Sequence, residues 1–104
     1  MSKYIYVYHG GQAPESEEEK AKVMDAWGQW FGSLGDDVVD GGNPLGPSTT
    51  VLSDLSVVDN GGANPASGYS LIEASDMDDA VAKAKGCPIY SEGGSVEIAE
   101  AFDM

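Results

Sequence analysis

The last third of the chain constrains the fold most strongly, because a strand, a helix and a second strand follow one another there without a break. Gly68–Ala74 (GYSLIEA) is rich in residues that favour a pleated strand. Asp76 stands at the start of the next segment, where an acidic side chain suits the positive end of a helix. Gly86–Pro88 carries the glycine and proline that end a helix. Ser95–Ala99 (SVEIA) then predicts the closing strand.

The first strand is predicted at Lys3–His9, where Tyr alternates with Ile and Val. Because successive side chains of a strand point to opposite faces, Ile5, Val7 and His9 share one face. Both faces are apolar, so this strand is expected to lie inside a sheet. The opposite face carries Tyr4, Tyr6 and Tyr8. This apolar patch is expected to be too large to stay exposed on a monomer, so a second copy of the chain is expected to cover it.

The first helix is predicted to begin at Ser16, which forms a capping box with Glu19, and to end at Gly35. Apolar residues recur at helical spacing between these points and form one stripe, made of Val23, Trp27, Trp30, Phe31 and Leu34. The two tryptophans could wall an aromatic pocket. For Trp27 the pattern favours core packing instead.

The middle of the chain is the least regular part. Val38–Asp40 predicts a short strand, and Thr49–Leu52 pairs with Leu55–Val58 as a hairpin across Ser53 and Asp54. The complete order is β–α–β–hairpin–β–α–β. This order predicts an α+β fold with a ferredoxin-like sheet, an extra hairpin and both helices on one face. With 104 residues, one domain spanning 1–104 is expected.

Composition excludes several classes of partner. The chain has 18 Asp and Glu against 5 Lys and Arg, for a formal net charge of −13. Nucleic acid and anionic membrane surfaces are therefore not expected as partners, because both are bound through basic side chains. No apolar stretch reaches the ~20 residues of a membrane span, and no secretory signal pattern is seen at the start. A cytoplasmic location is expected.

No cofactor or metal is predicted. The chain contains one histidine and one cysteine, Cys87, which is too few for a zinc centre built without carboxylates. A buried, inert thiol is the favoured interpretation of Cys87. Phosphate-binding and nucleophile motifs are also missing from the sequence.

The strand–helix–strand unit resembles the YCII-related, or DGPF-domain, family. Members of that family have a Gly-Tyr-Tyr-Leu-Ile strand, a helix rich in Asp and Ala, a Cys-Pro pair and a Gly-Ser-Val-Glu-Val strand. This chain matches at Gly68, Tyr69, Leu71, Ile72, Asp79, Ala80, Cys87, Pro88, Gly94, Ser95, Val96 and Glu97. The signature Asp-Gly-Pro-Phe is replaced here by Asp59–Pro65 (DNGGANP), which keeps only its aspartate and glycine content.

The resemblance implies a dimeric α/β barrel, in which two ferredoxin-like sheets face each other with clefts beside the interface. It implies no single reaction, although a His–Asp pair has suggested an enzymatic role for some members. The only histidine of this chain is His9, at the end of the first strand. It could act as a general acid and base, or be a hydrogen-bonded rim residue.

A cleft is expected between the end of the first strand, the first helix and the Gly41–Pro47 loop, and the remaining candidate residues could border it. Asp40 could orient His9 across neighbouring strands, but a turn aspartate is the favoured interpretation. Asn43 could bind a ligand or make a local turn. Tyr8, Trp30 and Tyr69 could line the cavity.

Two functions follow from these patterns. The first is a homodimer that binds a small molecule in a cleft near its interface. In it His9 would act as general acid and base, Asp40 would orient His9, and Asn43 and Tyr69 would position the substrate. The second is a non-catalytic accessory module whose acidic surface meets a cationic partner.

Overall fold

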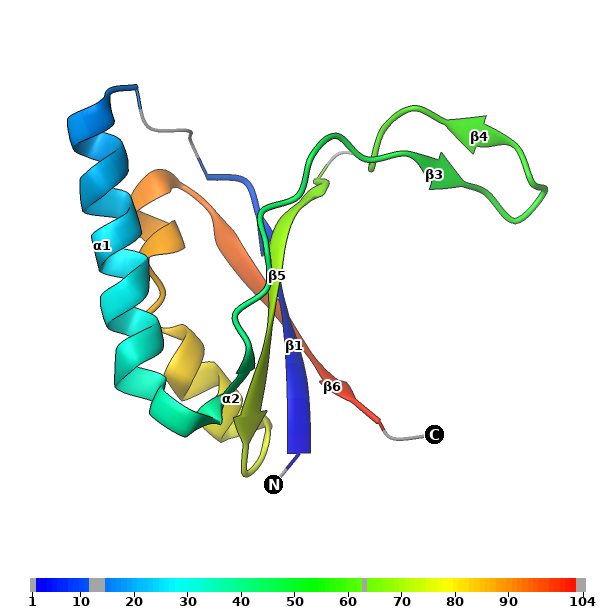
Figure 1. Ribbon diagram of the computed structural model, residues 1–104. Helices are drawn as coiled ribbons and strands as arrows, with labels where there is room; N and C mark the ends of the chain where they lie inside the picture. Colours follow the sequence, from blue (N-terminus) through cyan, green and yellow to red (C-terminus); the bar gives the residue numbers. More distant parts are fainter. Residues whose placement is uncertain (1, 12–14, 63, 103–104) are drawn as a thin grey trace.

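The computed structural model describes residues 2–11, 15–62 and 64–102. Within these ranges the elements are β1 (Ser2–His9), α1 (Glu17–Leu34), the 3₁₀ helix η1 (Gly35–Asp37), β2 (Val38–Asp40), β3 (Thr50–Val51), β4 (Val57–Val58), β5 (Ala66–Ala74), α2 (Met77–Ala84), the 3₁₀ helix η2 (Pro88–Glu92) and β6 (Ser95–Ala101). This arrangement confirms the predicted α+β class (Figure 1).

The main sheet has four antiparallel strands in the order β2-β5-β1-β6. The central position predicted for β1 is therefore confirmed. Both long helices lie on one side of the sheet (Figure 1). The predicted hairpin is also confirmed, as a separate two-stranded sheet of β3 and β4 that extends away from the other side.

Both helices begin where local sequence places their caps. The Glu19 amide donates to Ser16 Oγ at 3.1 Å, and the Glu19 carboxylate accepts from the Glu15 amide at 3.2 Å. At α2 the Asp79 amide donates to Asp76 Oδ1 at 2.8 Å. Each cap satisfies a backbone donor that the first turn of a helix leaves free.

The core lies between the helices and one face of the sheet. Tyr4, Tyr6 and Tyr8 are all buried on this face, beside Ser70 and Ile72 of β5. The Tyr6 hydroxyl donates to the Ala80 carbonyl of α2 at 2.5 Å. The prediction that a second copy covers the tyrosine face is therefore wrong, because the helices of the same chain cover it.

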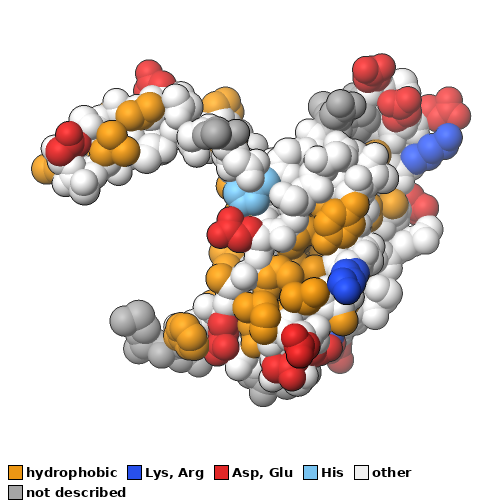
Figure 2. Space-filling view, turned by 180° about the vertical axis from the view of Figure 1, so that it is seen from behind, with side chains coloured by type: hydrophobic (Ala, Val, Ile, Leu, Met, Phe, Trp, Pro, Cys, Tyr) orange, Lys and Arg blue, Asp and Glu red, His pale blue; other side chains and the backbone are white. Residues whose placement is uncertain are grey.

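The opposite face of the sheet, here called the open face, carries no helix. Ile5, Val7 and His9 of β1 lie on it, next to Leu71 of β5 and Ala99 of β6. The hairpin and the C-terminal end of β6 both extend past this face, so that the outline of the molecule is hollowed between them (Figures 1 and 2). The open face is half-buried at its centre and exposed along β6.

The hairpin exposes large apolar side chains, which are visible along it in Figure 2. They are Val51, Leu52, Leu55 and Val57, with exposed fractions between 45% and 78%. A two-stranded hairpin alone is marginally stable in water. Across the described ranges, no helix has the length and apolar character needed to cross a membrane.

Candidate functional site

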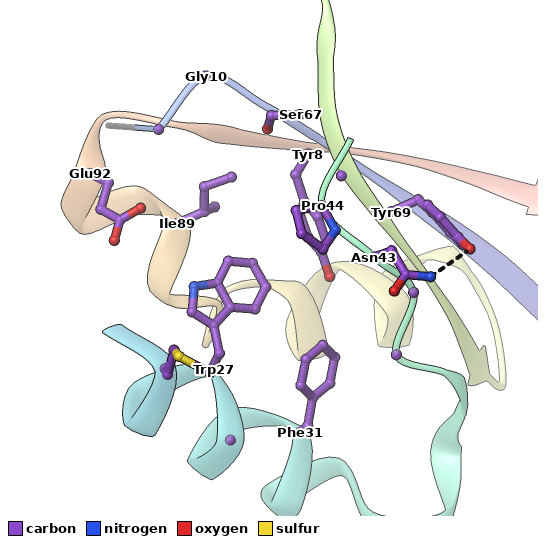
Figure 3. Close-up of a pocket in the computed structure, with 16 residues that line it drawn as sticks. Tyr8, Gly10, Trp27, Phe31, Asn43, Pro44, Ser67, Tyr69, Ile89 and Glu92 are labelled. Atoms are coloured by element: carbon purple, nitrogen blue, oxygen red, sulfur yellow. Dashed lines mark hydrogen bonds between the residues drawn. The ribbon is translucent and has the colours of Figure 1, made fainter. Parts of the chain in front are cut away.

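A pocket of about 660 Å³ lies between α1, the end of β1 and the loop after β2 (Figure 3). The 3₁₀ helix η2 closes its remaining side. The sequence predicted a cleft between the first three of these elements, and η2 was not expected. The lining residues are Tyr8, Gly10, Gly11, Met24, Trp27, Gly28, Phe31, Gly41, Gly42, Asn43, Pro44, Ser67, Gly68, Tyr69, Ile89 and Glu92.

Three aromatic rings form its main wall. Trp27 and Phe31 are four residues apart on α1 and therefore share a helix face. The centroid of the Trp27 ring lies 5.9 Å from that of Phe31 and 5.0 Å from that of Tyr8, which it meets edge to face. Such edge contacts are favourable for aromatic rings. The wall therefore joins β1, which carries Tyr8, to α1, which carries Trp27 and Phe31.

The Tyr8 ring is fixed in place by a buried chain of hydrogen bonds. The Tyr8 hydroxyl donates to Ser70 Oγ at 2.7 Å, and the Ser70 hydroxyl donates to the Gly41 carbonyl at 2.7 Å. Burial strongly raises the pKa of the Tyr8 phenol, which stays neutral at physiological pH. The chain links β1, β5 and the pocket loop into one unit.

The loop that forms the third wall runs close to β5. Gly42 has φ +73°, and a Cβ built on it would lie 2.6 Å from the carbonyl carbon of Tyr69 and nearer still to its oxygen. Only glycine fits this conformation at this approach. The Gly42 amide donates to Asp40 Oδ1 at 2.8 Å, which makes Asp40 a turn residue. Pro44 pairs with Gly68 as an isolated bridge, anchoring the end of the loop to β5.

Asn43 belongs to this loop and lines the pocket, and its side-chain amide is directed toward the Tyr69 hydroxyl (Figure 3). Its Nδ2 donates to the Tyr69 hydroxyl in a long hydrogen bond of 3.4 Å. The structure thus brings together three of the residues singled out from sequence, namely Tyr8, Asn43 and Tyr69.

The fourth wall comes from η2, which sequence reasoning missed. Ile89 is buried, and the Glu92 carboxylate lies beside Gly11 at the mouth of the pocket. The sequence did contain a signal for the start of η2, because Pro88 occupies its first turn, a position that proline favours. In the sequence, Pro88 predicts only the end of the preceding helix.

His9 lies outside the pocket, at the root of the hairpin. Its Nε2 is 2.9 Å from Glu97 Oε1, and its Nδ1 is 2.9 Å from the Asn64 carbonyl and 3.3 Å from that of Pro65. The hydrogen bond to Glu97 raises the pKa of the imidazole, and burial partly opposes this. Figure 2 shows this histidine, in pale blue, where the hairpin leaves the sheet.

The predicted pairing of His9 with Asp40 is not formed. The two residues were expected on neighbouring strands, but β5 separates β1 from β2. The residues that hydrogen-bond His9 within the described ranges are Glu97, Asn64 and Pro65. Neither His9 nor Asp40 lines the pocket.

The two tryptophans exchange the roles suggested by sequence. Trp30 is only 6% exposed, and its indole donates to the Lys83 carbonyl at 3.0 Å in the core. Trp27 is the one that reaches the pocket. Cys87 is buried, which raises the pKa of its thiol to about 11.

Comparison with known proteins adds no assignment. Neither protein-family models nor curated protein sequences give a match to this chain. Within the described ranges, His, Cys, Asp and Glu form no group of three or more that could hold a metal ion. The geometry of the pocket is therefore the main basis for assigning a function.

Proposed function

We propose that this protein binds a small organic molecule in the pocket between α1, η2 and the Gly41–Pro44 loop. The observation that carries the proposal is the aromatic wall of Tyr8, Trp27 and Phe31 around a cavity of about 660 Å³. Ligand pockets have volumes of roughly 300–1,000 Å³, with mostly apolar walls and a few polar groups. Asn43, Ser67 and Glu92 are such polar groups here.

Binding is proposed rather than acid–base catalysis by His9 and Asp40. A general base must be within hydrogen-bonding reach of its substrate. His9 is engaged by Glu97 and the hairpin root, and Asp40 is engaged by the backbone of its own turn.

The proposal includes a YCII-like, ferredoxin-like chain. The strand order β2-β5-β1-β6, with α1 and α2 on one face, supports it, because a ferredoxin-like sheet has this order when the hairpin is counted as an insertion. Gly68 is the first residue that this chain shares with the YCII-related pattern, and its surroundings explain why glycine is needed there. A Cβ there would press within 3.3 Å of both the Tyr8 ring and the Asn43 carbonyl oxygen.

The proposal also includes a homodimer formed through the open face. Ile5, Val7 and Leu71 lie there on adjacent strands without a covering helix. Sheets commonly bury such faces against one another. The molecule is hollowed on this side, between the hairpin and the end of β6 (Figure 2).

The binding proposal is tested by screening aromatic fragments with ligand-observed NMR. We expect several to bind, and we expect Trp27→Ala and Phe31→Ala to weaken them strongly because each removes part of the wall. Met77→Ala is the matched control, since Met77 is exposed at the start of α2, away from the pocket. Binding that survives both pocket substitutions would overturn the proposal.

The dimer is tested separately by sedimentation velocity at micromolar concentration. The expected species has twice the 10.8 kDa chain mass. Val7→Lys should shift it toward the monomer, because it places a charge in the proposed interface. Met77→Lys carries the same new charge elsewhere and should not. A monomeric wild-type protein would refute the dimer and leave the binding proposal standing.

A further inference from the structure

We propose that the molecule held by this pocket is a small organic cation, such as a quaternary ammonium compound or a protonated alkyl amine that carries an aromatic ring. This inference rests on the proposed binding function and names the class of ligand. It follows from the charges and the ring faces around the cavity.

The first argument is the charge of the lining. Glu92 is the only charged side chain among the described residues that line the pocket, and it stands at the mouth beside Gly11. No lysine or histidine belongs to that lining, and the whole chain has no arginine. A carboxylate or phosphate ligand would therefore enter without a counter-charge, which is costly in a partly buried site.

The second argument is that the Glu92 carboxylate forms no ion pair within the described part of the chain. The described residues provide no ion-pair partner for its carboxylate, since the ion pairs involve only His9–Glu97, Lys83–Asp37 and Lys83–Asp79. The negative charge at the mouth is thus free to attract a cation. The net charge of −13 acts in the same direction and over a longer range.

The third argument is the aromatic wall. The face of an aromatic ring carries negative charge, so that a cation over Trp, Tyr or Phe is attracted within about 6 Å of the ring centre. Trp, the best of the three, occupies the centre of the wall as Trp27, between Tyr8 and Phe31. The Tyr8 phenol stays neutral, because its burial raises its pKa. The wall therefore attracts a cation through ring faces, while Glu92 supplies the full charge.

The test uses probes of similar size and different charge: benzyltrimethylammonium, benzyl alcohol and benzoate. Their affinities are measured by ligand-observed NMR at pH 7 and low salt. We expect benzyltrimethylammonium to bind about tenfold more tightly than benzyl alcohol, as expected for a desolvated cation–π contact. We expect benzoate to show no binding.

Glu92→Gln tests whether the carboxylate of Glu92 attracts the cation. It should weaken benzyltrimethylammonium by about two- to fivefold, the range of a partly exposed charge pair, and should weaken benzyl alcohol less than that. Glu18→Gln is the matched control, because it removes the same charge from an exposed site near the start of α1. Equal effects of the two variants would overturn the role of Glu92.

The outcomes separate this inference from the function on which it rests. If benzyl alcohol or benzoate binds as tightly as the cation, and Trp27→Ala abolishes that binding, the pocket binds small molecules but the cation inference is wrong. If none of the three probes binds and the fragment screen also fails, the pocket proposal itself is wrong.

Discussion

The pocket loop depends on Gly42, and replacing this residue gives the sharpest test of the structure. Gly42→Ala adds one methyl group at a residue with φ +73°, directly against the Tyr69 backbone. Backbone cannot yield as a flexible side chain does. The loop must therefore move away from β5.

The expected cost has two parts. The left-handed conformation costs a residue with a Cβ roughly 1–2 kcal/mol. Movement of the loop also lengthens the 2.7 Å hydrogen bond from Ser70 to the Gly41 carbonyl, and losing a hydrogen bond of this kind costs about 0.5–1.5 kcal/mol. Together they predict a loss of about 1.5–3.5 kcal/mol in the free energy of unfolding.

The assay is equilibrium urea denaturation followed by tryptophan fluorescence. With a slope of about 1 kcal/mol per molar urea for a small domain, the midpoint should fall by about 1.5–3.5 M. Fragment binding by the folded variant should also weaken, because the displaced loop opens the third wall of the pocket.

Gly32→Ala is the matched control for the added methyl group. Gly32 lies within α1, and a Cβ there meets no atom within 4 Å. Alanine should stabilise the helix by up to about 1 kcal/mol. If Gly42→Ala instead lies within about 0.5 kcal/mol of wild type, the size of an ordinary surface substitution, the close approach of the loop to β5 is wrong.

Three further predictions concern residues outside the pocket. The folded state raises the pKa of His9, so its stabilising contribution is present below the ordinary pKa of 6.5 and is lost as pH rises through the raised value. The difference in unfolding free energy between wild type and His9→Gln should therefore shrink from pH 5.5 to pH 8.5. A constant difference would contradict the pairing of His9 with Glu97. Lys83→Met should destabilise by about 1–3 kcal/mol in urea titration, because the ammonium bridges Asp37 and Asp79 at 3.0 Å each and hydrogen bonds to charged groups have about this strength; an unchanged midpoint would show these ion pairs to be solvated. Cys87 should react with iodoacetamide only on unfolding, because burial raises its thiol pKa to about 11, and rapid native labelling would place it at the surface.

Much of the fold follows from local sequence. Ser16 and Asp76 cap the helices as their spacing predicts, and Gly35 ends α1. These features depend on residues three or four positions apart, so that a pattern along the chain is sufficient to identify them. The pocket was also located in outline, since Tyr8, Asn43 and Tyr69 all line it.

The sequence alone determined the order and the type of the elements, because hydrophobic period and capping are local properties. Only the tertiary structure decided which face of β1 the helices cover, since the tyrosine face and the Ile5–Val7 face are both apolar. It also decided that Trp27 lines the pocket while Trp30 enters the core, because both belong to one helical stripe. The partner of His9 was decided in the same way: Glu97 lies 88 residues away along the chain and meets His9 only where β6 pairs with β1. Contacts between residues so far apart in the sequence depend on the order and register of the strands, which no local sequence pattern specifies.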